Sequence, residues 1–211
     1  MKNSLLALLL VNLSGTFAIL GQQTFVYDQQ SSVDGVYREG GVEIQPTQPM
    51  GQSFTPSLNS VGFVRIYAYD ADSADGLGAT LYLNLRADSI TGPILGTTDP
   101  LALPNFFGRP VDFIFSTPVP VTPGTTYFFQ PVVQSGNTWG LNASDYNYAG
   151  GTAFVLGQPN TRNWDLWFRE GVVVPEPSSI TLISVGGIGL LFALRRRITK
   201  PTVGGRAVRT R

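Results

Sequence analysis

The 211-residue sequence contains no cysteine and no histidine. Without cysteine the chain has no disulfide, no thiolate metal ligand and no cysteine nucleophile. Without histidine it lacks the commonest metal ligand and the usual general base near neutral pH. Catalysis by serine–histidine–aspartate or cysteine–histidine groups is therefore excluded, and the folded part must be stabilised by burial and backbone pairing alone.

Charged residues are few, at 13% of the sequence, and they are unevenly placed. All 14 acidic residues lie at or before Glu176, whereas seven of the 14 basic residues follow it. When those seven and Lys2 are set aside, six basic residues remain against 14 acidic ones, so this part has a net charge near −8. Binding to nucleic acid through phosphates needs clustered lysine and arginine, so no nucleic-acid partner is expected.

Helical periodicity is also lacking between Gln22 and Gly171, where prolines recur throughout. Short apolar runs separated by glycine, proline, asparagine and aspartate predict strands instead, and Leu81, Leu83 and Leu85 alternate with polar residues as in a strand with one buried face. Nine such runs in residues 22–171 predict an all-β, jelly-roll-like β-sandwich. The runs are Thr24–Tyr27, Gln52–Thr55, Gly62–Tyr69, Thr80–Ala87, Val111–Ser116, Thr126–Val133, Thr138–Asn142, Thr152–Leu156 and Asn163–Phe168.

Residues 1–21 have the pattern of a secretory signal peptide helix. Lys2 precedes the apolar run Leu5–Val11, and a less apolar continuation follows. Small residues allow cleavage after Ala18 or after Gly21. The chain is therefore expected to be exported, and the absence of cysteine excludes a lipid-anchored form.

A second uncharged run lies near the other end of the chain. Residues 178–194 carry no charge and are followed by Arg195, Arg196 and Arg197. This pattern predicts a transmembrane helix over 178–194, with residues 198–211 forming a basic cytoplasmic tail. Proline at positions 175 and 177 prevents regular helix immediately before the run.

The order of Pro175, Glu176 and Pro177, an apolar span and an arginine block over residues 172–197 resembles the PEP-CTERM sorting signal of exported bacterial proteins. The resemblance implies a membrane-bound partner enzyme, exosortase, and an inner-membrane intermediate that is then transferred to the cell surface or extracellular matrix. Residues 198–211 depart from the usual pattern by continuing beyond the arginines. The alternative is an ordinary single-span anchor with a chance Pro-Glu-Pro sequence.

Four aromatic residues in the C-terminal third are candidate glycan contacts, because sugar rings stack on flat aromatic faces. Asparagine and aspartate, which can bind sugar hydroxyls, are interleaved with them. The alternative is a cluster in the core and its turns, since sandwich interiors also use tryptophan and tyrosine. Trp167 is expected to be exposed, because it alternates with Trp164, Leu166 and Phe168, which are expected to face the core. The four candidates are Trp139, Tyr146, Tyr148 and Trp167.

Three carboxylates, Asp70, Asp72 and Asp75, lie close together between two expected strands. Oxygen ligands around a turn suit a structural Ca²⁺ ion, although the spacing is not that of an EF-hand. Aspartate and glycine also build ordinary strand-connecting turns, and this interpretation is favoured. No other cofactor is expected.

Together these features predict a non-catalytic protein of the cell envelope or extracellular matrix that is associated with polysaccharide. The segments Gly51–Thr55 and Val119–Tyr127 resemble sandwich modules found beside PEP-CTERM tags, some of which resemble carbohydrate-binding domains. One alternative is a permanently membrane-anchored glycan-binding or adhesion protein. The other is a secreted glycan hydrolase that uses two carboxylates.

Overall fold

The computed structural model describes residues 23–175, of which Thr24–Val174 form one compact unit. This part consists of strands and two single-turn helices, η1 (Gln45–Thr47) and η2 (Ser73–Asp75), so the prediction of an all-β domain is confirmed. Within it, no helix has the length and apolar character needed to cross a bilayer. The predicted signal peptide (1–21), transmembrane helix (178–194) and basic tail (198–211) lie outside the described residues.

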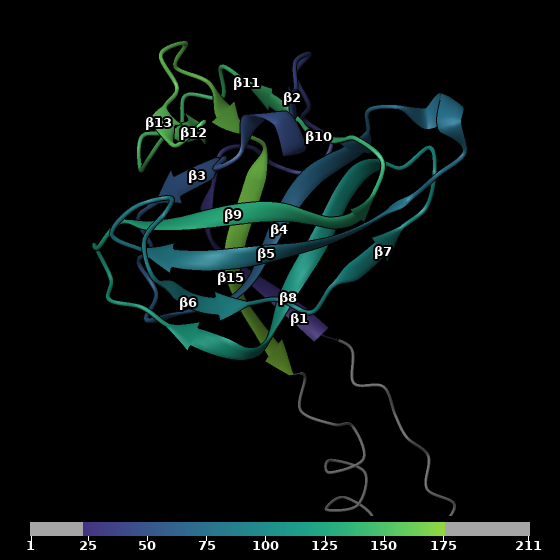
Figure 1. The fold of residues 1–211 in the computed structure, drawn as a ribbon. Coiled ribbons are helices and arrows are strands. Elements are labelled where there is room, and N and C mark those ends of the chain that lie inside the picture. Colours follow the sequence, from purple (N-terminus) through teal and green to yellow (C-terminus); the bar gives the residue numbers. More distant parts are fainter. Residues whose placement is uncertain (1–22, 176–211) are drawn as a thin grey trace, which may run out of the picture. The chain divides into compact units, whose positions relative to one another are not determined.

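The strands form two main sheets with a sandwich-like arrangement, shown in Figure 1, where β9 and β5 lie across β4 and β15. In the first sheet β4 is central, because β8 pairs with one of its edges while β15 and β10 share the other. Strand β1 continues the sheet beyond β15, and β2 continues it beyond β10. These strands are β1 (Gln23–Gln30), β2 (Val42–Glu43), β4 (Ser60–Asp70), β8 (Gly108–Pro120), β10 (Trp139–Leu141) and β15 (Phe168–Pro175).

The second sheet has the order β13-β12-β3-β9-β5-β6, with β7 pairing alongside β5. Its strands are β3 (Gly51–Phe54), β5 (Ala79–Ala87), β6 (Ile94–Thr97), β7 (Leu101–Leu103), β9 (Tyr127–Gly136), β12 (Ala153–Val155) and β13 (Gln158–Pro159). A separate two-stranded ladder joins β11 (Ala143–Ser144) to β14 (Asp165–Leu166).

The core lies between the sheets and follows the alternation that the sequence predicts. Leu81, Leu83 and Leu85 of β5 are fully buried, while the residues between them are less consistently so. From the first sheet, Phe168 contributes a ring to the same core, 5.2 Å from that of Phe129 in β9. Burial of these large apolar groups is the main stabilising contribution available to a domain without disulfides.

The strand expected at Asn163–Phe168 is interrupted at Trp167. The Trp167 amide donates to the Asn142 carbonyl at 2.9 Å, whereas the Trp167 carbonyl accepts from the Tyr67 amide at 3.4 Å. The chain therefore changes partner at this residue, from the segment after β10 to β4. This change separates β14 from β15 and shapes one end of the sandwich.

Candidate functional site

The prediction that Trp167 is exposed is wrong, because its side chain is completely buried. Its ring does lie on the side of the sheet away from Phe168, but another segment covers that side. The Trp167 indole Nε1 donates to the Val36 carbonyl at 3.0 Å, and its ring lies 5.7 Å from that of Tyr37. Trp167 therefore stabilises the loop above the sheet and has no free face for a sugar.

Trp139, the second predicted glycan contact, is also completely buried. Its indole Nε1 donates to Asn137 Oδ1 at 2.7 Å, and its ring lies 5.9 Å from that of Phe107. The alternative interpretation of these tryptophans as core residues is therefore the correct one.

The two predicted tyrosine contacts are half-buried. Tyr146 donates its hydroxyl proton to Asn142 Oδ1, while the Arg38 guanidinium lies 5.9 Å from the centre of its ring. Tyr148 donates to Gln29 Oε1 at 3.0 Å, and burial raises the pKa of its hydroxyl to about 12. Of the four predicted residues, Tyr148 lines a hollow at the surface.

The predicted calcium ligands form the turn around η2. Asn137 organises this turn, because its Nδ2 donates to Asp70 Oδ1 at 3.1 Å and to Asp75 Oδ1 at 3.0 Å. Asp70 Oδ1 also accepts the Asp72 amide at 3.0 Å. Within residues 23–175 no three acidic side chains are gathered closely enough to hold a metal ion. The observed contacts are those of a hydrogen-bonded turn.

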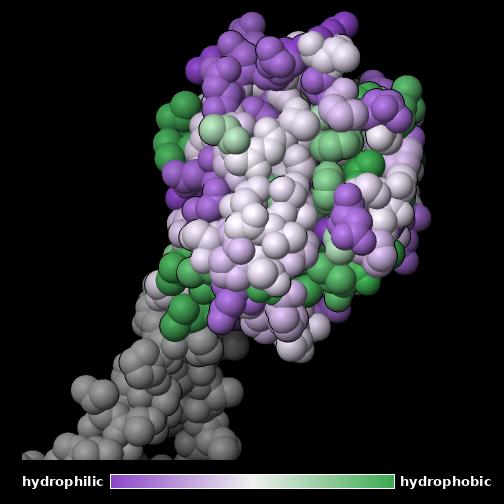
Figure 2. Space-filling model, turned by 90° about the vertical axis from the view of Figure 1, so that its left-hand side faces the viewer, coloured by the Kyte–Doolittle hydropathy of each residue, from purple (hydrophilic) through white to green (hydrophobic). Residues whose placement is uncertain are grey.

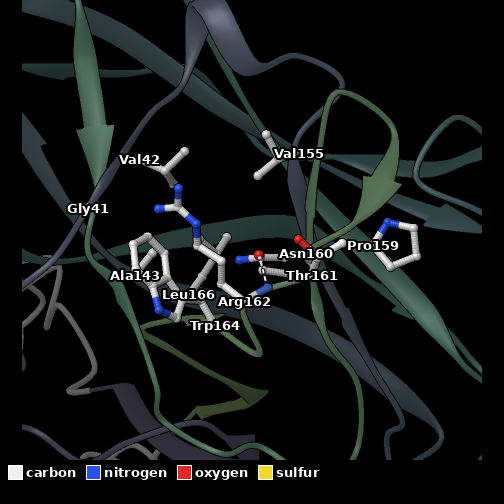
Figure 3. Close-up of a pocket in the computed structure, with 11 residues that line it drawn as sticks. Gly41, Val42, Ala143, Val155, Pro159, Asn160, Thr161, Arg162, Trp164 and Leu166 are labelled. Carbon is white, nitrogen blue, oxygen red and sulfur yellow. Dashed lines mark hydrogen bonds between the residues drawn. The ribbon is translucent and has the colours of Figure 1, made fainter.

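A cavity of about 410 Å³, called the main cavity below, lies where the strands of both sheets end beside the β11–β14 ladder. Figure 3 shows that Val42 and Val155 lie on opposite sides of it, with the guanidinium of Arg162 next to Val42. Ala143 and the ring of Trp164 form the adjoining wall. The cavity thus combines aliphatic surface, an aromatic ring and one positive charge.

The segment from Asn160 to Trp164 supplies the polar side of this cavity. Asn160 Oδ1 accepts the backbone amide of Arg162 at 2.8 Å, which closes a short turn. The Asn160 amide donates to the Ala153 carbonyl at 2.8 Å and thereby attaches the turn to β12. Asn163 then adopts a left-handed conformation with φ of 55°, so the chain turns before Trp164.

The adjoining side of the cavity is built on the β12–β13 hairpin. Its two turn residues, Leu156 and Gly157, have φ of 54° and 76°, the left-handed pair that a tight hairpin turn requires. Their amides donate to the carbonyls of Thr47 and Pro49, at 2.8 and 2.7 Å. The hairpin is therefore fixed to the chain around η1, so this wall of the cavity is held in place.

Arg162 has a distinctive electrostatic environment. Its guanidinium carbon lies 5.2 Å from the centre of the Trp164 ring, and the residues that line the cavity include no aspartate or glutamate. None of the ion pairs found within residues 23–175 involves Arg162. A cation–π contact leaves the donors at the rim of the guanidinium available, because it uses only the face of the group.

A smaller hollow of about 300 Å³ lies next to the same segment and is lined by Tyr148, Asn147, Asn163 and Asp165, among others. Asp165 is buried at its base, where it accepts Gln52 Nε2 at 2.9 Å and the Tyr148 amide at 2.8 Å. Burial raises the pKa of this carboxyl group, although these hydrogen bonds oppose the shift. Both carboxylate oxygens are thus already used in holding the segment.

Arg162 and Trp164 were not among the residues predicted from sequence to bind a ligand. Strand alternation placed Trp164 with the core, and it is in fact half-buried against the core with part of its surface in the cavity. The available signal was local: a polar turn that carries a lone arginine directly precedes a tryptophan. Val42 and Val155 are distant in sequence, and the tertiary fold brings Arg162 and Trp164 to the same cavity as these two residues.

At the other end of the described chain, β15 runs to Pro175. Residues 173–197 match the family model of the PEP-CTERM protein-sorting motif. The chain carries a PEP-CTERM sorting motif. Its three N-terminal residues, Val173, Val174 and Pro175, belong to β15. The remainder, including the predicted residues Glu176, Pro177 and Arg195–Arg197, lies outside the described residues.

The PEP-CTERM motif marks this chain as an exported protein that is processed at the membrane by exosortase and destined for the cell surface. A search of curated proteins found no match to the chain.

Proposed function

We propose that this protein is a non-catalytic component of the cell envelope or extracellular matrix, and that its β-domain associates with polysaccharide. The sorting motif at residues 173–197 is the observation that carries the cellular part of the proposal. We further propose that export begins with cleavage of a signal peptide within residues 1–21. The route then includes an inner-membrane intermediate held by the apolar run 178–194, before transfer to the surface or matrix.

The chemistry of the main cavity supports binding rather than hydrolysis. Glycoside hydrolysis uses two carboxyl groups on either side of the scissile bond, but the described lining of this cavity has neither aspartate nor glutamate. The carboxyl groups of Glu170 and Asp28 interact with each other, but neither residue lines the described hollows. No cofactor is required by this proposal, and the turn at Asp70 is held by Asn137.

The strand order supports the finer assignment of the domain as a jelly roll. The first sheet contains β1-β15-β4 with β8 on the far edge of β4, and the second contains β3-β9-β5-β6. Among these eight strands the chain changes sheet at every connection except the one from β5 to β6. Such alternation between two four-stranded layers is typical of jelly rolls, which include many lectin domains.

The cellular part of the proposal is tested by comparing cells with and without the sorting enzyme. The expected result is that the surface form loses the peptide containing Arg211 when the enzyme is present, as mass spectrometry would show. In enzyme-deficient cells the peptide should remain and the protein should stay in the membrane fraction. An intact Arg211 peptide on the surface form of both cells would instead support a permanently anchored adhesion protein.

The polysaccharide part is tested separately with the purified full chain in detergent. Retention on a panel of immobilised acidic and neutral polysaccharides, without release of reducing sugar, is the expected result. Release of reducing sugar would support the hydrolase alternative, and failure to bind any polysaccharide would contradict the proposed association.

A further inference from the structure

Arg162 differs from the other arginines of the described chain by its place in the main cavity. The domain is acidic overall, and three of its arginines, Arg38, Arg65 and Arg169, each form an ion pair with aspartate. Arg162 is exposed on a turn and is the one charged residue among those that line the main cavity. A guanidinium held inside a concave site and free of any described acidic partner is arranged to meet a negative charge from a ligand.

The surroundings of Arg162 define the rest of that ligand. The ring of Trp164 and the side chain of Val42 offer apolar surface next to the guanidinium, and Val155 adds apolar surface across the cavity (Figure 3). Asn160 points its side-chain amide into the same space. Its Oδ1 accepts the Arg162 amide within the turn, whereas its Nδ2 has no hydrogen-bond partner among the described residues. An aromatic ring with a neighbouring amide donor suits a sugar, whose ring has apolar faces and a hydroxylated rim.

The outer surface around the cavity agrees with a polar, flexible ligand. In Figure 2 the upper end of the domain, which carries β2, β11, β12 and β13 in Figure 1, is largely hydrophilic. A docking surface for a folded protein partner usually has an apolar centre with depleted charge. A mainly polar surface with one concave, partly apolar site is better suited to a polysaccharide segment.

We propose that the cavity binds a carboxylate-bearing sugar unit, such as a uronic acid within an acidic polysaccharide. The Arg162 guanidinium binds the sugar carboxylate, Trp164 contacts the sugar ring, and Asn160 Nδ2 donates to a hydroxyl. This inference rests on the proposed polysaccharide association and adds the site and the class of ligand.

Two quantities support this choice of ligand. The cavity volume of about 410 Å³ falls in the usual range for small-ligand sites, about 300–1,000 Å³, so a short stretch of chain is bound. A planar guanidinium matches the two oxygens of a carboxylate, and charge-assisted bonds are roughly twice as strong as neutral ones. A neutral sugar would leave these donors without an ionic partner and should bind more weakly.

The test measures binding of the full chain in detergent to oligogalacturonate, by calorimetry, with the carboxyl-reduced oligosaccharide as the matched neutral ligand. Arg162→Gln should weaken binding of the acidic ligand about 10- to 100-fold. It should change binding of the neutral ligand little. Trp164→Ala should weaken binding of both ligands. Increasing salt from about 50 to about 500 mM should weaken binding of the acidic ligand alone, because salt screens charge interactions.

Arg109→Gln is the matched control. Arg109 also lies over an aromatic ring, that of Phe107 at 4.9 Å, and does not line the cavity. This variant should bind as the unmodified protein does. Equal affinity for the acidic and neutral ligands, or an Arg162→Gln variant with unchanged affinity, would overturn the inference while leaving polysaccharide association intact. If the protein bound neither oligosaccharide and no polysaccharide in the panel, the proposed association itself would be contradicted.

Discussion

At the residue scale, Glu170 is the most unusual titratable group in the described chain. It lies in β15 with no exposed surface, and its Oε1 accepts the Gln29 amide at 3.1 Å. Oε2 accepts no hydrogen bond, but a proton on this carboxyl group can be donated to the neighbouring Asp28. Burial, followed by the neighbouring charge of Asp28, raises the pKa of Glu170 to about 8. The carboxyl group is therefore protonated in the folded protein at neutral pH.

This protonation makes stability depend on pH. In the unfolded chain Glu170 has its ordinary pKa of 4.5, so between about pH 4.5 and 8 the folded state binds one proton more. The free energy of unfolding should then fall by up to about 1.4 kcal/mol per pH unit as the pH rises, and level off above the folded pKa. Burial tends to raise the pKa of Asp28, but hydrogen bonds from Ser57 and Leu58 lower this pKa overall. Asp28 therefore affects the pH dependence of stability only at more acidic pH.

Glu170→Gln should remove most of this fall in the free energy of unfolding with rising pH, because glutamine keeps the size of the side chain but carries no titrating proton. Urea denaturation at about pH 5, 6.5 and 8 measures the effect. Glu39→Gln, at an exposed loop position, is the control and should keep the decline of the unmodified protein. Identical pH slopes for Glu170→Gln and the unmodified protein would show that Glu170 is already ionised in the folded state.

The tryptophans show how far residue patterns predict a site. Alternation correctly placed Trp167 on the side of the sheet opposite Phe168, yet it could not indicate that the loop around Val36 covers that side. The same reasoning assigned Trp164 to the core, where only part of its ring is buried. Exposure depends on what packs above a strand, and this information lies in contacts distant in sequence.

The two tryptophans should therefore respond oppositely to mutation. Trp167→Ala should lower the free energy of unfolding by about 3–5 kcal/mol, the usual cost of deleting a buried aromatic side chain. Trp164→Ala should cost less, because its ring is partly exposed, but should weaken ligand binding. Chemical denaturation and the binding assay separate the effects. A mildly destabilised Trp167→Ala variant that loses ligand binding would contradict these assignments.

At the element scale, the β12–β13 hairpin carries local strain. Leu156 has φ of 54° and is 62% exposed, so its side chain gains little from burial while its backbone adopts a conformation unfavourable for leucine. Asparagine tolerates this conformation much better. Leu156→Asn should raise the free energy of unfolding by about 1 kcal/mol.

Leu77→Asn is a matched control for that substitution, because Leu77 is 57% exposed and has an ordinary backbone conformation. Thermal denaturation of the two variants should show a higher midpoint for Leu156→Asn alone. Destabilisation by Leu156→Asn would mean that the leucine side chain makes a contribution of its own at this turn.

The turn around η2 leads to a prediction about metal removal. Because Asp70 and Asp75 already accept hydrogen bonds from Asn137, calcium is not needed to order them. Adding a chelator should change the melting temperature by less than about 1 °C, whereas Asn137→Ala should lower it by several degrees. A rise of several degrees in the presence of Ca²⁺, abolished by Asp75→Asn, would support a calcium site instead.

Elements with a clear pattern were predictable, and those without one were not. The nine predicted strands each overlap an observed strand, because runs such as Thr80–Ala87 alternate over many residues. Strands β2, β11 and β13 contain two residues each, too few for any period to be recognised. The cavity is built beside these short elements, which explains why its position was not predictable from sequence.

At the scale of the whole molecule, the sorting motif begins inside the fold. Strand β15 lies between β1 and β4, so it is an interior strand of its sheet. Residues Phe168–Gly171 pair with Phe63–Ile66, and the motif starts only two residues later, at Val173. Processing downstream of Pro175 would leave this ladder complete, whereas removal of the whole strand would expose the edge of β4 and the core beneath it.

Two truncations test this relation between the fold and the motif. A chain that ends at Pro175 should keep the near-ultraviolet circular dichroism of its buried tryptophans and melt within about 5 °C of the longer chain. A chain that ends at Trp167 should lose that signal, because Phe168 and the β4 ladder are absent. If both truncated chains remained folded, β15 would be dispensable and the domain would end before the motif. If the chain ending at Pro175 unfolded, residues beyond it would have to contribute to the stability of the domain.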